Sequence, residues 1–333
     1  MQKKWKYIII YITNDEGEIC VAVGKNTLMD PKVDYVFKLI FGLDKDECKI
    51  ALRGLLNSIL NLEDKIKEIV YLNPYLDKQY EEDKQSILDI KVKTNKGEKI
   101  DIEMQLVSYE NLKKRFLYYW SKLYIDDFKS GEDYEKLNKV IQIIIVKDDL
   151  IKETKKYHTK YKIKEVEENF EYINDMELHI IELGKFFENE KNVEKMDRLE
   201  RWLTFLKDAD DESKRKVIEK IIEREEEIKM AHETLEQVSQ DDIERDRALR
   251  RAIFLSDMTS MRNEARRKGL AEGKEKGREE GREEGREEGK RKRDRMIVIN
   301  MLNNNLTKDQ IADYTGLSKE EIDEAVNRVR EED

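Results

Sequence analysis

The pair of acidic residues best suited to chemistry in this sequence is Asp89 and Glu103. Residues 86–93 and 98–107 each alternate between apolar and polar side chains, which predicts two half-buried strands. The loop Asn95-Lys96-Gly97 between them suits a type I turn that closes on a left-handed glycine. Counting back from this loop along both strands places Asp89 directly opposite Glu103.

Directly opposed residues of an antiparallel pair have Cβ atoms about 4.5 to 5.5 Å apart, on the same face of the sheet. Two carboxylates at that range repel each other unless a divalent cation lies between them. Oxygen ligands of this kind suit Mg²⁺ or Mn²⁺. Such an ion can polarise a phosphodiester, activate water and stabilise charge on the phosphoryl oxygens. We therefore expect metal-assisted hydrolysis, with Asp89 and Glu103 as metal ligands.

The two faces of the second strand differ in character. Asp101, Glu103 and Gln105 share one face, and the apolar residues between them share the other. We expect the apolar face to be buried and the polar face to open to a cleft that holds the site. The alternative is that these acids are ordinary exposed strand residues.

Two helices are predicted before this hairpin. Asp30 is placed to be an N-cap and Pro31 the first helical residue, where its missing N–H costs nothing. Val33, Val36, Phe37 and Ile40 then recur at helical spacing. A second helix, Glu47–Leu60, carries leucines on one side.

Three further elements are predicted after the hairpin. Helical spacing returns over Tyr109–Phe128, and the nearly continuous apolar run Val140–Val146 indicates a buried strand. Residues 176–183 form another predicted strand, more consistent with a core edge than with a ligand site at His179. This order of helices and strands is typical of an α/β fold with a mixed sheet flanked by helices. We assign it to residues 29–190.

The chain before this core is predicted to be a hairpin with strands Tyr7–Ile12 and Glu18–Val23. We treat residues 1–28 as an N-terminal extension. Two alternatives stay open for it, an appended leader and a native chain that begins at Met29.

Residues 191–268 are predicted to form a helical arm, followed by a charged linker over 269–295. The linker repeats glycine every fourth residue, at Gly273, Gly277, Gly281, Gly285 and Gly289. Each glycine costs a helix about 1 kcal/mol, and each opposite-charge pair returns only about 0.2 to 0.5 kcal/mol. The segment is therefore expected to be a poor helix and an extended tether.

Residues 296–333 are predicted to form a small helical unit. Thr307 caps one helix, and Ser318 with Glu321 forms a capping box for the next. Two short helices joined at a glycine resemble a helix-turn-helix. The second helix is acidic, which opposes contact with phosphate. A homo-oligomer formed through these helices is therefore as well supported as DNA binding.

Composition limits the class of protein. Of the 333 residues, 42% are charged and the net charge is −10, so a large solvated segment is expected. The charge argues against coating of nucleic acid by bulk electrostatics, while a local basic groove stays open. Two cysteines and three scattered histidines predict neither a disulfide framework nor a zinc site. The longest apolar run near the start is too short to span a membrane. We expect a cytoplasmic protein that does not bind membranes.

From Met29 to about Phe187 the chain resembles the PD-(D/E)XK nuclease family transposases, also called Rpn-type recombination-promoting nucleases. The resemblance lies in Val33-Asp34-Tyr35-Val36-Phe37-Lys38-Leu39-Ile40-Phe41-Gly42, Leu88-Asp89-Ile90, Ile102-Glu103-Met104-Gln105 and Tyr118-Tyr119-Trp120-Ser121-Lys122-Leu123-Tyr124.

The resemblance implies a restriction-endonuclease-like core that cleaves DNA with Mg²⁺ or Mn²⁺, in connection with recombination or mobile elements. It makes Asp89 the first acid of the motif and Glu103 the second, and it places Gln105 where many nucleases of the superfamily have lysine. Asp34 matches the helical acid that completes the metal site, the alternative being an acid that favours the helix dipole. The rival functions are a catalytically inactive DNA-binding or scaffold protein with the same fold, and an RNA-directed nuclease.

Arg115 and Tyr119 lie one helical turn apart after the strand that carries Glu103. They are candidates for contact with a substrate phosphate. The alternative is that Tyr119 packs in the core and Arg115 is solvated.

Overall fold

The computed structural model describes residues 8–14, 17–23, 27–76, 86–87, 89–106, 111–186 and 192–332. The chain divides into two compact units, residues 1–259 and 260–333. The candidate site lies in the first.

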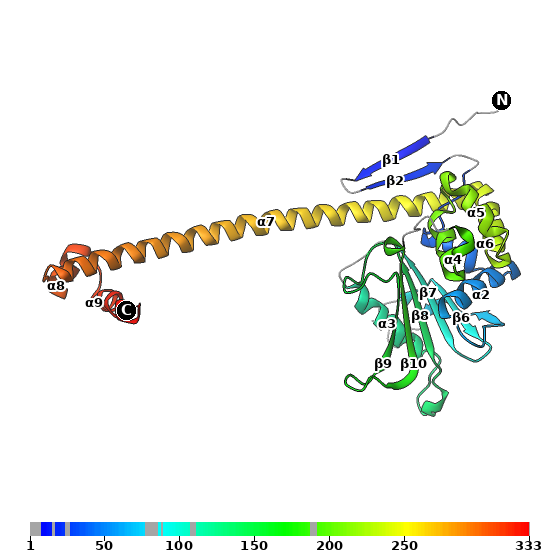
Figure 1. Ribbon diagram of the computed structural model, residues 1–333, viewed down its shortest axis with the longest axis horizontal. Coiled ribbons are helices and arrows are strands. Elements are labelled where there is room, and N and C mark those ends of the chain that lie inside the picture. The colour runs from blue at the N-terminus through cyan, green and yellow to red at the C-terminus, as the bar shows by residue number, and fades with distance from the viewer. Residues whose placement is uncertain are drawn as a thin grey trace. The chain divides into compact units, whose positions relative to one another are not determined.

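A six-stranded mixed sheet forms the centre of the first unit (Figure 1). β8 lies between β7 and β10 and is parallel to both, and the other neighbouring strands are antiparallel. In spatial order the strands are β3 (Ile69–Tyr71), β6 (Ile90–Thr94), β7 (Lys99–Gln105), β8 (Val140–Val146), β10 (Glu171–Glu182) and β9 (His158–Lys164).

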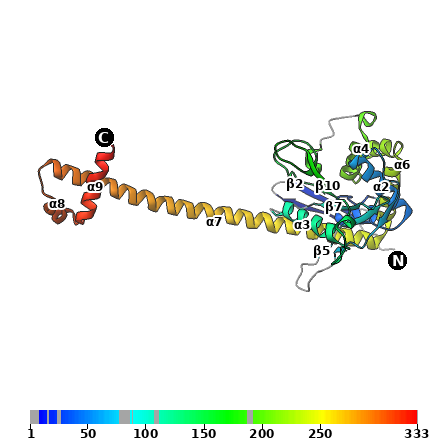
Figure 2. The same ribbon diagram turned by 90° about the horizontal axis from the view of Figure 1, so that it is seen from below.

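Helices cover both faces of this sheet, and Figure 2 shows them from a second direction. α1 (Asp34–Phe41) and α2 (Asp46–Leu60) lie on one face, and α3 (Leu112–Ile125) lies on the other. The mixed sheet flanked by helices confirms the predicted α/β class. α4 (Arg198–Asp208) and α6 (Glu226–Gln240) pack against α2, α6 also contacts α1, and α5 (Arg215–Ile222) packs against α4 and α6.

The main hydrophobic core lies between the sheet and the α1–α2 layer. Its fully buried side chains include Phe37, Phe41, Leu55, Ile102, Ile143, Trp202 and Phe205. A smaller cluster on the opposite face joins Leu112 and Phe116 of α3 to Ile144 and Val146 of β8. The sheet is therefore covered on both sides, as its continuous apolar strand β8 predicts.

The register of the β6–β7 hairpin agrees with the prediction. Thr94 N donates to Glu98 O at 2.9 Å, and Gly97 has a φ of 86°, in the left-handed region that favours glycine. The paired residues include Ile90 with Ile102. The same register, extended by one residue, places Asp89 opposite Glu103.

Several predicted boundaries shift. The helix expected to begin at Pro31 begins at Asp34, because the Asp30 side chain accepts from Lys32 N at 2.9 Å and Val33 is extended. Asp30 thus stabilises a turn before the helix and does not cap it. The predicted strand 86–93 is divided into β5 (Ser86–Ile87), which pairs with β4 (Tyr75–Leu76), and β6. Leu88, Val107 and Tyr109 lie outside the described residues.

The predicted N-terminal hairpin is present as β1 (Ile8–Asn14) and β2 (Gly17–Val23), paired antiparallel. Tyr7 and the turn residues Asp15 and Glu16 lie outside the described residues. β9 was not predicted from the sequence, since four of its residues, from His158 to Lys164, are lysine or histidine.

The glycine repeat is helical, contrary to the prediction of a poor helix. It lies within α7 (Asp242–Asn303), which crosses the boundary between the two units. Ion pairs one turn apart, such as Lys276 with Glu280 and Lys292 with Glu288, offset part of the cost of the glycines. Growth of a helix that is already nucleated also avoids the initiation cost of an isolated segment.

The second unit ends in α8 (Lys308–Thr315) and α9 (Lys319–Glu332), which pack with the end of α7 around Val298, Ile311 and Ile322. Both predicted caps are present. Thr307 forms a capping box with Gln310, and Ser318 forms one with Glu321. Across both units, no helix in the described part of the chain is long and apolar enough to span a membrane.

Short 3₁₀ helices occupy Tyr134–Lys136, Leu183–Lys185, Val193–Lys195 and Glu212–Lys214.

Candidate active site

Asp89 and Glu103 are held together by main-chain hydrogen bonds at the start of β6. Asp89 N donates to Glu103 Oε1 at 3.1 Å, and Met104 N donates to Asp89 Oδ2 at 2.9 Å. The two carboxylates are therefore brought together as the hairpin register predicts. Each is oriented by the strand that carries the other.

The polar face of β7 is buried, which corrects the prediction of an open cleft. Glu103 is 2% exposed, Asp101 is fully buried, and Gln105 is 9% exposed. α3 covers this face, because Phe116 packs against β8 and Lys99 Nζ donates to the Leu123 carbonyl at 3.3 Å. The alternation of side chains along a single strand cannot predict that a helix later in the chain packs on its polar face.

A basic side chain accompanies each acid that the sequence placed at the site. Lys38 Nζ lies 2.8 Å from Asp89 Oδ1. An Arg115 nitrogen lies 3.8 Å from Glu103 Oε2. The basic residues come from α1 and α3, which lie on opposite faces of the sheet.

Asp34 is paired with Arg251 of α7. Arg251 Nε donates to both carboxylate oxygens at 2.9 and 3.0 Å, and its Nη2 donates to Oδ2 at 2.5 Å. This is the strong bidentate geometry of an arginine–carboxylate pair. The predicted metal-binding role of Asp34 stays a prediction. Among the described residues, the acids, histidines and cysteines form no group of three that could hold a metal ion.

Burial disfavours the charged form of the acids on this face. Together with repulsion from Asp101 and Asp89, burial raises the pKa of Glu103 well above its usual range. Burial also raises the pKa of Asp89, although Lys38 opposes this shift. Burial raises the pKa of Asp101 to about 7.

Asp101 was placed on this face by the alternation of β7 but was given no role in the predicted site. Gln142 Nε2 donates to its Oδ2 at 2.9 Å. Its Oδ1 is buried and has no hydrogen-bond partner in the part of the chain that the structure describes. Its position two residues before Glu103 predicts the shared face, whereas its buried and unpartnered oxygen is visible only in the structure.

Asp89 and Glu103 offer the donor types that a divalent cation prefers, although the described residues do not gather three acids, histidines or cysteines into a formed metal site. The two acids are linked through the Asp89 amide, and Asp101 Oδ1 is a buried oxygen on the same face with no hydrogen-bond partner among the described residues. Hard oxygen donors of this type suit Mg²⁺ or Mn²⁺. A positive charge between close, buried acids also counters the repulsion and burial that raise their pKa.

The remaining candidates have other neighbours. Arg115 Nε donates to Tyr119 Oη at 3.0 Å, and its guanidinium carbon lies 5.0 Å from the centroid of the Tyr119 ring. Tyr119 packs against Leu123 and Val140, in agreement with the alternative that it belongs to the core. Gln105 lies on the face that α3 covers, and a neutral amide there can form hydrogen bonds but adds no charge.

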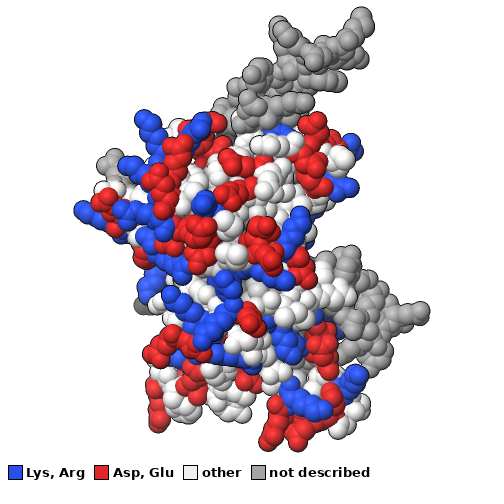
Figure 3. Space-filling view, turned by 90° about the vertical axis from the view of Figure 1, so that its right-hand side faces the viewer, with Lys and Arg blue, Asp and Glu red and all other residues white. Residues whose placement is uncertain are grey.

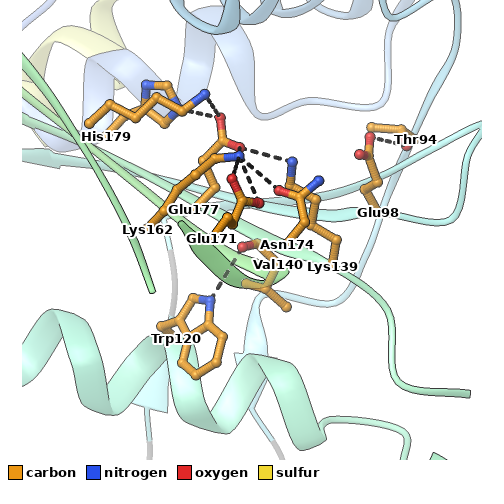
Figure 4. A network of polar contacts seen from close by, with 11 residues as sticks. Thr94, Glu98, Trp120, Lys139, Val140, Lys162, Glu171, Asn174, Glu177 and His179 are labelled. Atoms are coloured by element: carbon orange, nitrogen blue, oxygen red, sulfur yellow. Dashed lines mark hydrogen bonds and ion pairs between the residues drawn. The ribbon is translucent and has the colours of Figure 1, made fainter. Parts of the chain in front are cut away.

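A second polar network lies at the far edge of the sheet (Figure 4). Glu177 is 1% exposed, and its carboxylate lies 2.8 Å from Lys139 Nζ, 2.5 Å from Lys160 Nζ and 2.8 Å from His179 Nε2. His179 Nδ1 lies 2.8 Å from His158 Nε2. His179 lies within strand β10, which agrees with the predicted strand at the edge of the core.

The surface in Figure 3 interleaves basic and acidic side chains. On that face the described residues present no broad basic area, in line with the net charge of −10. Attraction of a polyanion on this face would therefore depend on local groups.

Residues 31–265 match the family model described as PD-(D/E)XK nuclease family transposase. The matched segment is more than half of the 333-residue chain and contains the hairpin, α1, α3 and Arg251. The comparison with curated proteins finds no match, and neither does the comparison with solved structures.

Proposed function

Because the chain belongs to the PD-(D/E)XK nuclease family transposases, we propose that it is a metal-dependent DNA endonuclease that hydrolyses phosphodiester bonds. The observation that carries the proposal is the pair of a partly buried Asp89 and a buried Glu103, joined by main-chain hydrogen bonds within the matched segment. A role in recombination or in mobile elements follows from the family description and belongs to the same proposal.

Asp89 and Glu103 would hold Mg²⁺ or Mn²⁺. The ion, when bound, supplies charge that polarises the phosphodiester and favours ionisation of water. The protein contributes the orientation of both acids, since the amides of Asp89 and Met104 restrict their carboxylates before substrate arrives.

The proposed reaction is hydrolysis of one phosphodiester bond. The oxygen of water forms a new bond to phosphorus, the bond from phosphorus to the deoxyribose oxygen breaks, and the departing oxygen takes up a proton that the water gives up. Gln105, which follows Glu103 on the same face, can orient water or substrate only by hydrogen bonding.

Basic residues near the site support a polyanionic substrate. Lys113 and Lys114 are exposed at the start of α3, directly before Arg115. Lys38 is 37% exposed next to Asp89. Contacts of lysine and arginine with phosphate position nucleic acid independently of its sequence.

Plasmid nicking with Mg²⁺ or Mn²⁺ tests the proposal. We expect Glu103→Gln to slow nicking by about 100-fold or more, because the substitution removes one of the two acids that hold the ion. Glu98→Gln is the matched control, since Glu98 lies at the turn of the same hairpin, away from the acidic pair, and its carboxylate accepts from Thr94 Oγ1. Nicking by Glu103→Gln at the rate of the wild type would refute the proposal.

A second function is supported by the pairing of Asp34, Asp89 and Glu103 with basic side chains and by the neutral Gln105. This alternative is a DNA-binding or scaffold protein that keeps the fold without cleavage. Binding of duplex DNA with no nicking at any divalent-ion concentration would favour it. Parallel assays on RNA of the same sequence test the choice of substrate.

A further inference from the structure

Lys38 is the basic residue most directly linked to the acidic pair. It lies on α1, one helical turn after Asp34, and its Nζ lies 2.8 Å from Asp89 Oδ1. Although burial lowers it, the pKa of Lys38 is raised overall by Asp89, Asp34 and Glu103. Lys38 is therefore close enough to Asp89, Asp34 and Glu103 for each of these acids to favour its charged form.

Other basic residues near these acids have their own partners, and the buried Lys91, opposite Asp101 in the hairpin, is paired with Asp126. Arg251 is locked in a bidentate pair with Asp34. Arg115 is bonded to Tyr119 and stacks over its ring. Lys38 has a flexible stem, and 37% of its side chain is exposed, so its amine can turn from Asp89 toward a bound ligand.

Hydrolysis of a phosphodiester builds negative charge on the phosphoryl oxygens, and a positioned cationic side chain stabilises that charge. Gln105 cannot do this, because its amide carries no charge. Lys38 approaches Asp89 from α1, so it reaches the acids from a different element than Gln105 on β7.

We propose that Lys38 is a catalytic lysine of this site, which contacts the scissile phosphate and supplies the positive charge that Gln105 lacks. The inference rests on the proposed nuclease function. Before a divalent cation binds, the same ammonium group neutralises Asp89.

Because one amine serves both roles, its removal should change metal binding and the cleavage rate in opposite directions. The ammonium group competes with a divalent cation for Asp89, so its removal should strengthen metal binding. Its removal should also weaken stabilisation of the developing charge, and cleavage should slow. A residue that only supports the fold would weaken both together when substituted.

The experiment compares Lys38→Met, Lys38→Arg and the control Lys49→Met in the full chain. Lys49 is a suitable control, because it lies on α2 away from the site. Its side chain is 35% exposed and pairs with the acid Asp44. Mn²⁺ affinity is measured by calorimetry, folding by thermal unfolding, and cleavage by single-turnover rates at saturating Mn²⁺ and DNA.

We expect Lys38→Met to bind Mn²⁺ roughly three- to tenfold more tightly and to cleave about 100-fold more slowly than the wild type. Lys38→Arg should recover part of the cleavage rate, and Lys49→Met should match the wild type in both measurements. Cleavage by Lys38→Met within about threefold of the wild-type rate would overturn the inference while leaving the nuclease function intact.

The other outcomes are equally decisive. If Lys38→Met does not fold, Lys38→Arg provides the test. A folded Lys38→Arg that binds Mn²⁺ normally but cleaves DNA no faster than the unfolded Lys38→Met would overturn the inference. A wild-type protein that cleaves no DNA would overturn the proposed function and this inference together. Weaker Mn²⁺ binding and slower cleavage in a folded Lys38→Met would also overturn it, by indicating a merely supporting role.

Discussion

The Asp89 amide donates to Glu103 Oε1 at 3.1 Å, so the residue that supplies one acid also orients the other. The Glu103 carboxylate is buried, the Asp89 side chain is 12% exposed, and the charge of Asp89 acts on Glu103. Lys38 and Arg115 offset part of the cost of this arrangement, yet the pKa of each acid stays raised. Metal binding should consequently be visible in the stability of the protein as well as in its activity.

We expect millimolar Mg²⁺ or Mn²⁺ to raise the melting temperature of the wild-type protein. A ligand present at 100 times its dissociation constant stabilises the native state by about 2.7 kcal/mol. Asp89→Asn should remove most of this gain, because it removes a charged ligand, whereas Asp44→Asn, at an exposed acid, should not. Differential scanning fluorimetry measures the response, and an equal shift in wild type and Asp89→Asn would count against the metal site.

Gly54→Ala should destabilise the first unit, although alanine favours helices. A Cβ at Gly54 would lie 2.5 Å from Glu227 Cβ and 3.1 Å from a Trp202 ring atom, so α2 and α6 would have to separate. Overpacking of this kind costs about 1 to 3 kcal/mol, more than the roughly 1 kcal/mol that alanine contributes. Urea unfolding gives the free energy. Gly273→Ala is the control, because nothing lies within 4 Å of its Cβ position, and it should preserve or increase helicity.

His158 should make the protein less stable as the pH falls from about 6.5 to about 4. Burial, followed by the charges of His179 and Lys160, lowers the pKa of His158 to about 4. Between these pH values the unfolded chain binds a proton that the native protein does not, so acidification favours unfolding. The expected contribution is roughly 1 to 3 kcal/mol.

The test of this prediction is the free energy of unfolding at a series of pH values. His158→Gln should reduce the loss over this range, and Lys164→Gln, exposed on the same strand, should not. Glu177 contacts His179 and has a lowered pKa. Its contribution to the free energy of unfolding is therefore lost only at pH values below the ordinary pKa of a glutamate. An unchanged pH dependence in His158→Gln would contradict the assignment.

A chain that ends at Arg267 should fold and retain the chemical step of any cleavage. It keeps Arg251, which is bonded to Asp34, and Glu244, which is bonded to Tyr35. A chain that ends at Asp241 loses both contacts and the buried Ala248, and should be less stable. Single-turnover cleavage at saturating DNA separates binding from chemistry. A chain ending at Arg267 that binds DNA normally but does not cleave it would refute the prediction.

Local features of the sequence were sufficient to predict much of the fold. The three-residue loop with Gly97 determines the register of β6 and β7, because turn geometry and side-chain alternation act over a few residues. The buried stripe of α2 and the caps at Thr307 and Ser318 are local in the same sense. The opposition of Asp89 and Glu103 follows from that register and was predictable for this reason.

Competing local preferences explain the errors at boundaries. Asp30 can cap a helix or stabilise a turn through the next amides, and here it forms the turn before Asp34. The glycine repeat has a low helix propensity, but it continues the helix that begins at Asp242 and carries ion pairs one turn apart. In both cases two local conformations are close in free energy, and interactions with neighbouring residues decide between them.

By itself, the sequence determined the α/β class, the hairpin register and the family resemblance, because all three depend on patterns within short segments. Tertiary structure alone decided that α3 buries the polar face of β7 and that the acids receive basic partners from separate helices. Lys38 lies 51 positions before Asp89, and Arg251 lies 217 positions after Asp34. Contacts at such separations depend on how whole elements pack, and no local periodicity encodes them.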